Sequence, residues 1–309
     1  MTDMNGLTVI IPFLNEGGEV ERTLESVRST AASPVEILLV NDCSDDGYGY
    51  RAVAGKYGCR YIEHETRKGV AASRDEGAAL CRTEDFLLLD AHMEFYEKGW
   101  DAEISRVLQE NPESILCCQT RILDAARKRT KPSSAFGAFL ALDRENILKC
   151  RWNRHDSDPE APVAEVPVVL GGAYAARKSY WQHLHGLKGL VRYGMDEELI
   201  SMKCWTEGGR CLLLKNLEAG HIYRRQFPYP VTNGDVLHNK IFIAELFFGG
   251  EARKNILDRL KGHYGENLFG RVYGDMDRDL IESECRHLKA ICRKNTAYFL
   301  YKNVSLRQS

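Results

Sequence analysis

Short apolar runs alternate with stretches of helical periodicity over the first hundred residues of the chain. The runs at 7–11, 35–40 and 86–89 are too short for helices and predict strands buried on both faces, and a further short strand is expected at 60–64. Between these runs, apolar residues recur every three or four positions, as they do after the Gly17-Gly18 turn. Such alternation predicts an α/β protein with a mostly parallel central sheet flanked by helices.

The second part of the chain shows a less regular pattern. Helices are expected at 100–109 and after the acidic turn at 193–198, and strands at 115–119, 166–170 and 210–215. A long irregular segment with two basic stretches precedes the second of these strands. Late in the chain the apolar spacing becomes helical throughout.

Two structural units follow from this pattern. Residues 1–232 are expected to form the sheet domain, and residues 233–309 a helical C-terminal extension packed on it. The 309 residues suffice for a substantial core, and 44% hydrophobic with 28% charged residues is typical of a soluble globular protein. The net charge of -2 provides no global attraction to nucleic acid or anionic lipid.

Targeting and redox signals are sparse in this sequence. No apolar run approaches about 18 residues, so no membrane span is expected, and the first residues lack the apolar region of a signal peptide. The ten cysteines form no CxxC pair and show no zinc-like spacing. We therefore expect reduced thiols and a cytoplasmic localisation.

Two side chains suited to a metal follow the strand at 86–89. Asp90 and His92 are two positions apart, so in extended backbone they point to the same side of the strand end. The alternative is that Asp90 caps the next turn and His92 is a surface residue. Asp42 and Arg67 stand after neighbouring predicted strands, and ligands of parallel sheets bind at the carboxyl ends of the strands. We therefore expect a ligand site at this edge of the sheet.

Several motifs in order along the chain carry a family resemblance. They are the residues 8–16, the strand 37–42, Arg67-Lys68-Gly69-Val70, Asp90-Ala91-His92, Gly171-Gly172 and the stretch 220–229. With these motifs the chain resembles a family 2 type glycosyltransferase of GT-A fold, and in particular the catalytic domain of the polypeptide N-acetylgalactosaminyltransferases. The likeness covers roughly residues 7–232, and the helical residues beyond it lack the pattern of that family's lectin domain.

The resemblance implies an enzyme that moves a hexose or N-acetylhexosamine from a UDP-sugar to an acceptor hydroxyl. His221 matches the family's third metal ligand beside Asp90 and His92, although a histidine there could also be a core residue. Carboxylate and imidazole ligands suit Mn²⁺ better than Mg²⁺, which is the alternative cofactor. Arg224 would bind the diphosphate, and Tyr229 would close over it. The other expected donor contacts are Pro12, Asn15, Glu16, Asp42, Arg67, Asp90, Gly171 and Gly172.

Some of these residues have plain structural alternatives. Arg67 could be an exposed loop charge, and Asp42 could cap a helix. Asp196 and Glu197 depart from the family's Gly-Gly-Glu-Asn motif, and with Arg224 they complete the expected catalytic set. Either acid could be a general base in an inverting reaction, or both could belong to the acidic first turn of a helix. The spacing favours Glu197 as the base, and the stereochemical outcome stays open.

Three hypotheses for the function remain open at this point. In the leading hypothesis, the enzyme transfers the sugar to a peptide, a protein or a glycan. A second acceptor is a hydroxymethylated base in DNA, held by the basic stretches at 127–131 and 151–154. The third reading is a non-catalytic module that binds a sugar nucleotide or a glycan, which the Asp90, His92 and His221 set disfavours.

Overall fold

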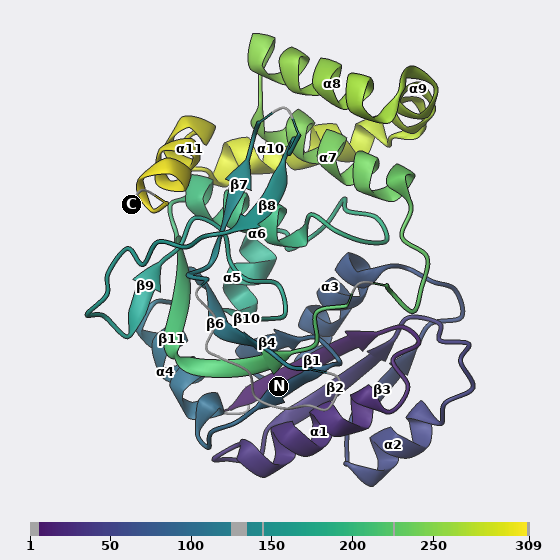
Figure 1. The fold of residues 1–309 in the computed structure, drawn as a ribbon, viewed down its shortest axis with the longest axis vertical. Helices are drawn as coiled ribbons and strands as arrows, with labels where there is room; N and C mark the ends of the chain where they lie inside the picture. The colour runs from purple at the N-terminus through teal and green to yellow at the C-terminus, as the bar shows by residue number, and fades with distance from the viewer. Residues whose placement is uncertain (1–5, 125–134, 144, 225, 308–309) are drawn as a thin grey trace.

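A nine-stranded sheet forms the centre of the protein (Figure 1). The computed structural model describes residues 6–124, 135–143, 145–224 and 226–307. The sheet strands are β1 (Leu7–Phe13), β2 (Glu36–Asn41), β3 (Arg60–Glu63), β4 (Asp85–Leu89), β5 (Met93–Phe95), β6 (Ser114–Ile122), β9 (Val163–Glu165), β10 (Ala173–Arg177) and β11 (Arg210–His221). Their order is β3-β2-β1-β4-β10-β6-β11-β5, with β9 paired to β11. Among these described strands six share one direction, and β5, β9 and β10 run opposite to them.

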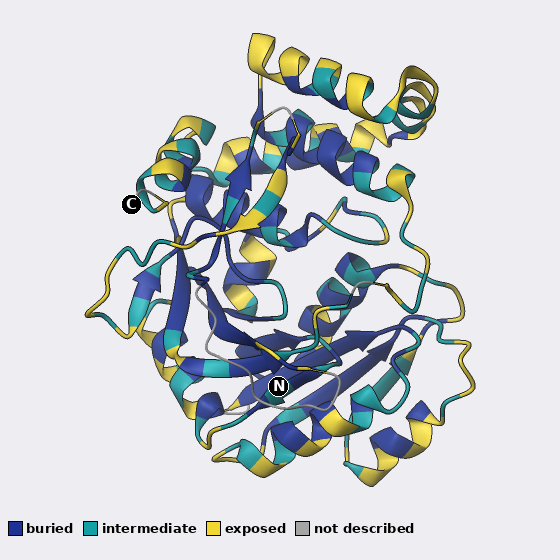
Figure 2. Ribbon diagram, in the orientation of Figure 1, coloured by how far each residue is buried: buried dark blue, intermediate teal, exposed yellow. Residues whose placement is uncertain are grey.

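Helices cover both faces of this sheet. They are α1 (Glu19–Thr30), α2 (Tyr50–Lys56), α3 (Val70–Leu80), α4 (Trp100–Glu110), α5 (Lys178–His183), α6 (Asp196–Glu207), α7 (Asn233–Phe247), α8 (Gly250–Tyr264), α9 (Glu266–Asp275), α10 (Arg278–Ile291) and α11 (Thr296–Ser305). Alternate residues of β1 serve different faces, since Val9 packs with α1 and α4 while Ile10 packs with α3 and α6. The strands are buried almost throughout, and the helices expose their outer sides (Figure 2).

Most expected elements form close to their predicted bounds. The runs at 7–11, 35–40, 60–64 and 86–89 give β1 to β4, and the α/β class with a mostly parallel sheet is confirmed. The irregular segment before β9 contains a separate two-stranded hairpin of β7 (Ala138–Ala141) and β8 (Lys149–Trp152). Local polarity hid this hairpin, because β8 is mostly exposed.

The strand predicted at 166–170 is wrong. This apolar run is buried but makes only an isolated bridge between Val168 and Ala138, and the nearby strands are β9 and β10. Pro167 has no amide hydrogen to give to a ladder. Its neighbours bond elsewhere, since the Val166 N–H donates to the Cys211 carbonyl and the Val169 N–H to Ser201 Oγ.

Helices α7 to α11 follow the sheet and share a core with it. Leu237, Ile241 and Phe242 of α7 belong to the same buried cluster as Tyr174 of β10 and Trp205 of α6. The expected helical content after residue 232 is therefore present, while its status as a separate unit stays a prediction. Across the described residues, every helix is too short or too polar to cross a membrane.

Candidate active site

A cavity of about 330 Å³ opens where β1, β2, β4 and β11 end. Nearly all the residues singled out in the sequence line it, although they come from loops spread over more than 200 positions. They are Pro12, Glu16, Asp42, Arg67, Asp90, His92, Gly171, Gly172, Asp196, Glu197, His221, Arg224 and Tyr229. Parallel strand order brings these loops to one edge of the sheet. The cavity lies at the sheet edge that the strand-end pattern predicted.

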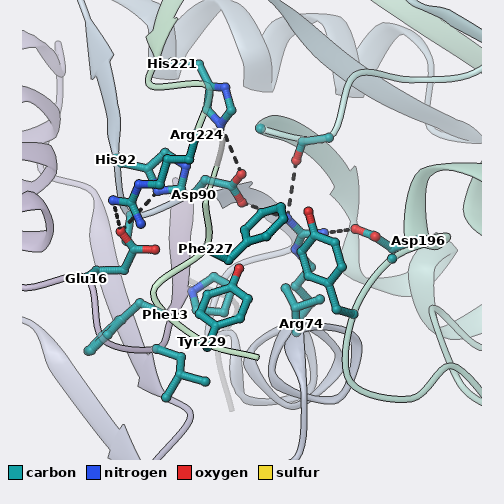
Figure 3. Close-up of a pocket in the computed structure, with 18 of the residues that line it drawn as sticks. Phe13, Glu16, Arg74, Asp90, His92, Asp196, His221, Arg224, Phe227 and Tyr229 are labelled. Atoms are coloured by element: carbon teal, nitrogen blue, oxygen red, sulfur yellow. Dashed lines mark hydrogen bonds and ion pairs between the residues drawn. The ribbon is translucent and has the colours of Figure 1, made fainter. Parts of the chain in front are cut away.

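The base of the cavity carries a set of three potential metal ligands. Asp90 follows β4, His92 precedes β5 and His221 ends β11, and their ligand atoms all lie within 4.8 Å of one another. His221 Nε2 is 3.4 Å from Asp90 Oδ2, and the two imidazole ring centres are 4.9 Å apart (Figure 3). Both ring nitrogens of His221 are buried: Nδ1 has no hydrogen-bond partner, and Nε2 has the ion-pair contact with Asp90 but no hydrogen bond. Buried polar atoms are normally paired, so these nitrogens fit a divalent cation.

The protonation states of these groups also fit a cation. Burial alone would raise the pKa of Asp90, but its contacts with His221 and Arg74 outweigh burial and lower the pKa to about 2. Burial lowers the pKa of His221 below its usual value. At neutral pH the site therefore offers an ionised carboxylate and a neutral imidazole, which are the forms that bind metals.

Arg74 is a site residue that the sequence analysis did not single out. Its guanidinium group donates to Asp90 Oδ1 at 2.8 Å and to the Gly171 carbonyl at 3.3 Å, and it pairs with Asp196 (Figure 3). Its side chain is only 5% exposed. Helix α3, which carries Arg74, packs closely on β1, since a Cβ on Gly77 would lie 2.3 Å from Ile10 Cγ2. Arg74 thus fixes the orientation of the Asp90 carboxylate from behind.

Glu16 joins two other functional groups of the cavity. Its buried carboxylate pairs with the Arg224 guanidinium group, and Oε2 is 3.3 Å from His92 Nδ1 (Figure 3). A carboxylate next to a ligating histidine fixes the orientation and raises the basicity of the imidazole ring. In this arrangement Arg224 is held at the cavity wall, close to His92.

The two acids at the start of α6 have different surroundings. Asp196 is buried and its carboxylate is paired with Arg74. Glu197 lines the cavity and lies against Gly171, where an added Cβ would come 1.7 Å from Glu197 Oε1. Burial raises the pKa of Glu197 above its usual value, partly opposed by Arg74. Of the two acids, Glu197 is therefore the more exposed one, and its pKa is raised.

Asp42 and Arg67 also line the cavity. Asp42 accepts hydrogen bonds from the Lys68 N–H at 2.7 Å and the Gly69 N–H at 2.8 Å, so it fixes the loop before α3. Arg67 donates to the Pro230 carbonyl at 2.8 Å and stands 5.2 Å from the Tyr229 ring centre. The helix-capping alternative for Asp42 does not apply to α2, whose N-cap is Gly49.

Aromatic side chains form the mouth of the cavity. Phe227 and Tyr229 have ring centres 5.7 Å apart, and Tyr193 is 4.9 Å from Phe227. On another side, Trp152 of β8 meets Tyr223 edge-on at 5.2 Å. Trp152 was named only within a basic stretch in the sequence, because its place at the cavity depends on the hairpin that carries it.

Two expectations fall outside this cavity. Asn15 does not line it, and its side chain instead bonds to Asp45 in the loop after β2. Its donor contact stays a prediction. The basic stretch at 127–131 lies outside the described residues.

Comparison with known proteins agrees with this geometry. The model of the glycosyl transferase family 2 matches residues 8–163. Human polypeptide N-acetylgalactosaminyltransferase 10 is 30% identical over 254 residues, covering 78% of this chain and 42% of the relative. Bovine polypeptide N-acetylgalactosaminyltransferase 6 is 26% identical over 292 residues, covering 88% and 46%. The chain thus spans less than half the length of these two curated relatives.

Solved structures show the same fold. A crystal structure of GalNAc-T7 with UDP, GalNAc and Mn²⁺ aligns with a TM-score of 0.75 at 19% identity, covering 97% of this chain and 57% of that one. The structure of S. aureus TarS residues 1–349 with UDP-GlcNAc aligns with a TM-score of 0.60 at 15% identity, covering 98% and 89%. The expected GT-A fold is confirmed. From the match over residues 8–163, the chain belongs to the glycosyl transferase family 2.

Proposed function

We propose that this protein is a metal-dependent glycosyltransferase that moves a hexose or N-acetylhexosamine from a UDP-sugar to an acceptor hydroxyl. The observation that carries the proposal is the convergence of Asp90, His92 and His221 at the base of the cavity. Proteins of the same fold support it, because one solved structure holds UDP and Mn²⁺ and another holds UDP-GlcNAc.

The ligand set suits Mn²⁺, with Mg²⁺ as the alternative. Asp90, His92 and His221 would hold the ion, which when bound supplies positive charge for the leaving diphosphate. Arg224 lies beside this set and would add a charge-assisted hydrogen bond to the diphosphate. Arg74 would keep Asp90 oriented and ionised.

Other residues of the cavity would bind and shield the donor. Asp42, with Pro12 nearby, would border the uridine, and Arg67 the donor diphosphate or ribose. The Gly171-Gly172 pair leaves room for the sugar beside the metal ligands, since a Cβ on Gly172 would come 3.2 Å from His221 Cδ2. Tyr229 would cover the donor and exclude water, which limits its hydrolysis.

We assign the general base to Glu197 and a positioning role to Asp196. Both acids line the cavity, but Asp196 is buried and paired with Arg74, whereas Glu197 is partly exposed. A base at this position accepts the proton of the acceptor hydroxyl as it attacks the anomeric carbon, and such a single displacement inverts the configuration. A product that retains the configuration of the donor, determined from its anomeric coupling by proton NMR, would remove this assignment.

The named relatives act on polypeptides, and they support a peptide or protein acceptor here, with a glycan as the alternative. The proposal is tested by a screen of UDP-sugars against peptides, glycans and hydroxymethylated DNA with Mn²⁺, read by mass spectrometry. We expect a mass increase of one sugar on one acceptor class. Neither transfer nor donor hydrolysis with any UDP-sugar would instead indicate a binding module.

A further inference from the structure

The hairpin of β7 and β8 contributes one residue to the cavity lining but is separate from the main sheet (Figure 1). Trp152, at the end of β8, lines the cavity and is 42% exposed. An isolated two-stranded hairpin is marginal in water, so its position depends on the elements packed against it. The neighbours of the hairpin therefore determine where the Trp152 ring lies.

The outer edge of β7 is paired with a side chain of the C-terminal extension. Asn303 of α11 accepts a hydrogen bond from the Leu140 N–H at 2.7 Å and donates one to the Leu140 carbonyl at 2.9 Å. Both bonds are buried, and Asn303 is 4% exposed. The amide group thus replaces an adjacent strand at this position, satisfying two backbone groups that would otherwise be buried without partners.

Further contacts from the extension continue this attachment. Asn153, directly after β8, donates to the Leu306 carbonyl at 3.0 Å. The Arg307 guanidinium group lies 4.4 Å from the ring centre of Phe139 in β7. Arg259 of α8 donates to the Leu142 carbonyl, just after β7, at 2.9 Å.

The other side of the hairpin is attached to the catalytic helix. Glu198 of α6, next to the proposed base Glu197, accepts a hydrogen bond from the Cys150 N–H of β8 at 2.9 Å. The hairpin is thus bonded to α6 on one side and to α11 on the other. Its register pairs Ala138 with Trp152 and Leu140 with Cys150, so a shift of β7 at Leu140 is transmitted to Trp152.

We propose that Asn303 is a positioning residue that sets the acceptor side of the cavity by holding the β7–β8 hairpin and, through it, the Trp152 ring. This inference rests on the proposed function, because only a transferase binds an acceptor at this side of the cavity. It assigns the C-terminal helices a part in substrate placement, in addition to their part in the core. Exposed aromatic rings at a cavity mouth provide large contact areas for a ligand.

The test uses the full chain labelled with 5-fluorotryptophan and read by fluorine NMR. The protein has four tryptophans, and the Trp152 signal is assigned by its loss in Trp152→Phe. Asn303→Leu removes both bonds to Leu140 at similar volume and should shift or broaden the Trp152 signal. Trp205 reports on α11 itself, because its ring lies 6.3 Å from Tyr298 of that helix.

Tyr301→Ala is the matched control, since Tyr301 lies on the same helix and is 64% exposed. It should leave the signals of Trp152 and Trp205 unchanged. Mn²⁺-dependent donor hydrolysis should stay within about twofold of the original enzyme in both variants, because the metal ligands lie elsewhere. An unchanged Trp152 signal in Asn303→Leu would overturn the inference. A shift of the Trp205 signal together with the Trp152 signal would also overturn it, because it would mean that α11 has detached.

Failure of the proposed function gives a different result. An original protein that neither transfers a sugar from any UDP-sugar nor hydrolyses one would remove the transferase, whatever the fluorine spectra show. A Trp152 signal that does not respond in an enzyme that hydrolyses its donor would remove only the positioning role of Asn303.

Discussion

The buried pairing of Arg74 with Asp90 and Asp196 makes a strong prediction about stability. Arg74→Met keeps much of the apolar volume but removes the charge, leaving a buried Asp196 carboxylate without its partner. The side chains of Arg74 and Asp196 are only 5% and 6% exposed, so solvent cannot take over the role of the guanidinium group. Breaking a buried pair in this way costs about 3–5 kcal/mol.

This cost translates into a melting temperature. With ~2–4 °C per kcal/mol for domains somewhat smaller than this one, differential scanning calorimetry should show Arg74→Met melting about 6–20 °C below the original protein. The double variant with Asp196→Asn should recover a substantial part of that loss, because it removes the uncompensated charge. Its transferase activity should stay low, since Asp90 still lacks its oriented partner.

Arg106→Met provides the control for removal of an arginine. Arg106 pairs with Glu103 and Glu110 on the surface of α4 and is 48% exposed. Exposed pairs of this kind contribute little to stability, so this variant should melt close to the original protein and well above Arg74→Met. If Arg74→Met melts no lower than Arg106→Met, the buried network does not stabilise the fold and the reasoning is refuted.

Four further predictions concern the site and the core. His92→Ala should lower Mn²⁺-dependent turnover at least ~10-fold and weaken Mn²⁺ binding in calorimetric titration. Glu197→Gln should lower kcat by ~100- to 10,000-fold with UDP affinity nearly unchanged, and a loss below tenfold would exclude a general base. Gly171→Ala should lower kcat with little change in melting temperature, because the new methyl group displaces the flexible Glu197 side chain. Burial lowers the pKa of Lys203 to about 8. The unfolded chain (lysine pKa ~10.4) therefore binds more protons between these values, and the free energy of unfolding should rise from pH 8 to 10 in the original protein relative to Lys203→Met, as measured by denaturant titration.

The sequence predicts the parts of this protein that depend on local pattern. Strands β1, β2 and β4 are short apolar runs between turn residues, and their parallel order places Asp42 and Asp90 at one edge of the sheet. His221 could be placed by its likeness to a family motif, although it follows His92 by 129 positions. Pro167 explains the one strand that fails, since its ring interrupts an otherwise apolar run.

Long-range pairing is the part that the pattern does not contain. The sequence assigns no role to Arg74 on its predicted helix, and only the fold brings it to Asp196, 122 positions away. The choice between Asp196 and Glu197 also depends on long-range contacts, because two adjacent acids at the start of a helix differ only in the residues that surround them in the fold. Trp152 likewise reaches the cavity through a hairpin whose position is set by Asn303, far along the chain.

The central claim is that a metal held by Asp90, His92 and His221 supports transfer from a UDP-sugar. It is tested most directly by UDP release from UDP-GalNAc and UDP-GlcNAc, measured with Mn²⁺, with excess chelator, and in His221→Ala. The account predicts UDP release with Mn²⁺ that falls at least ~10-fold in the variant and is abolished by the chelator. Undiminished release in excess chelator would contradict it.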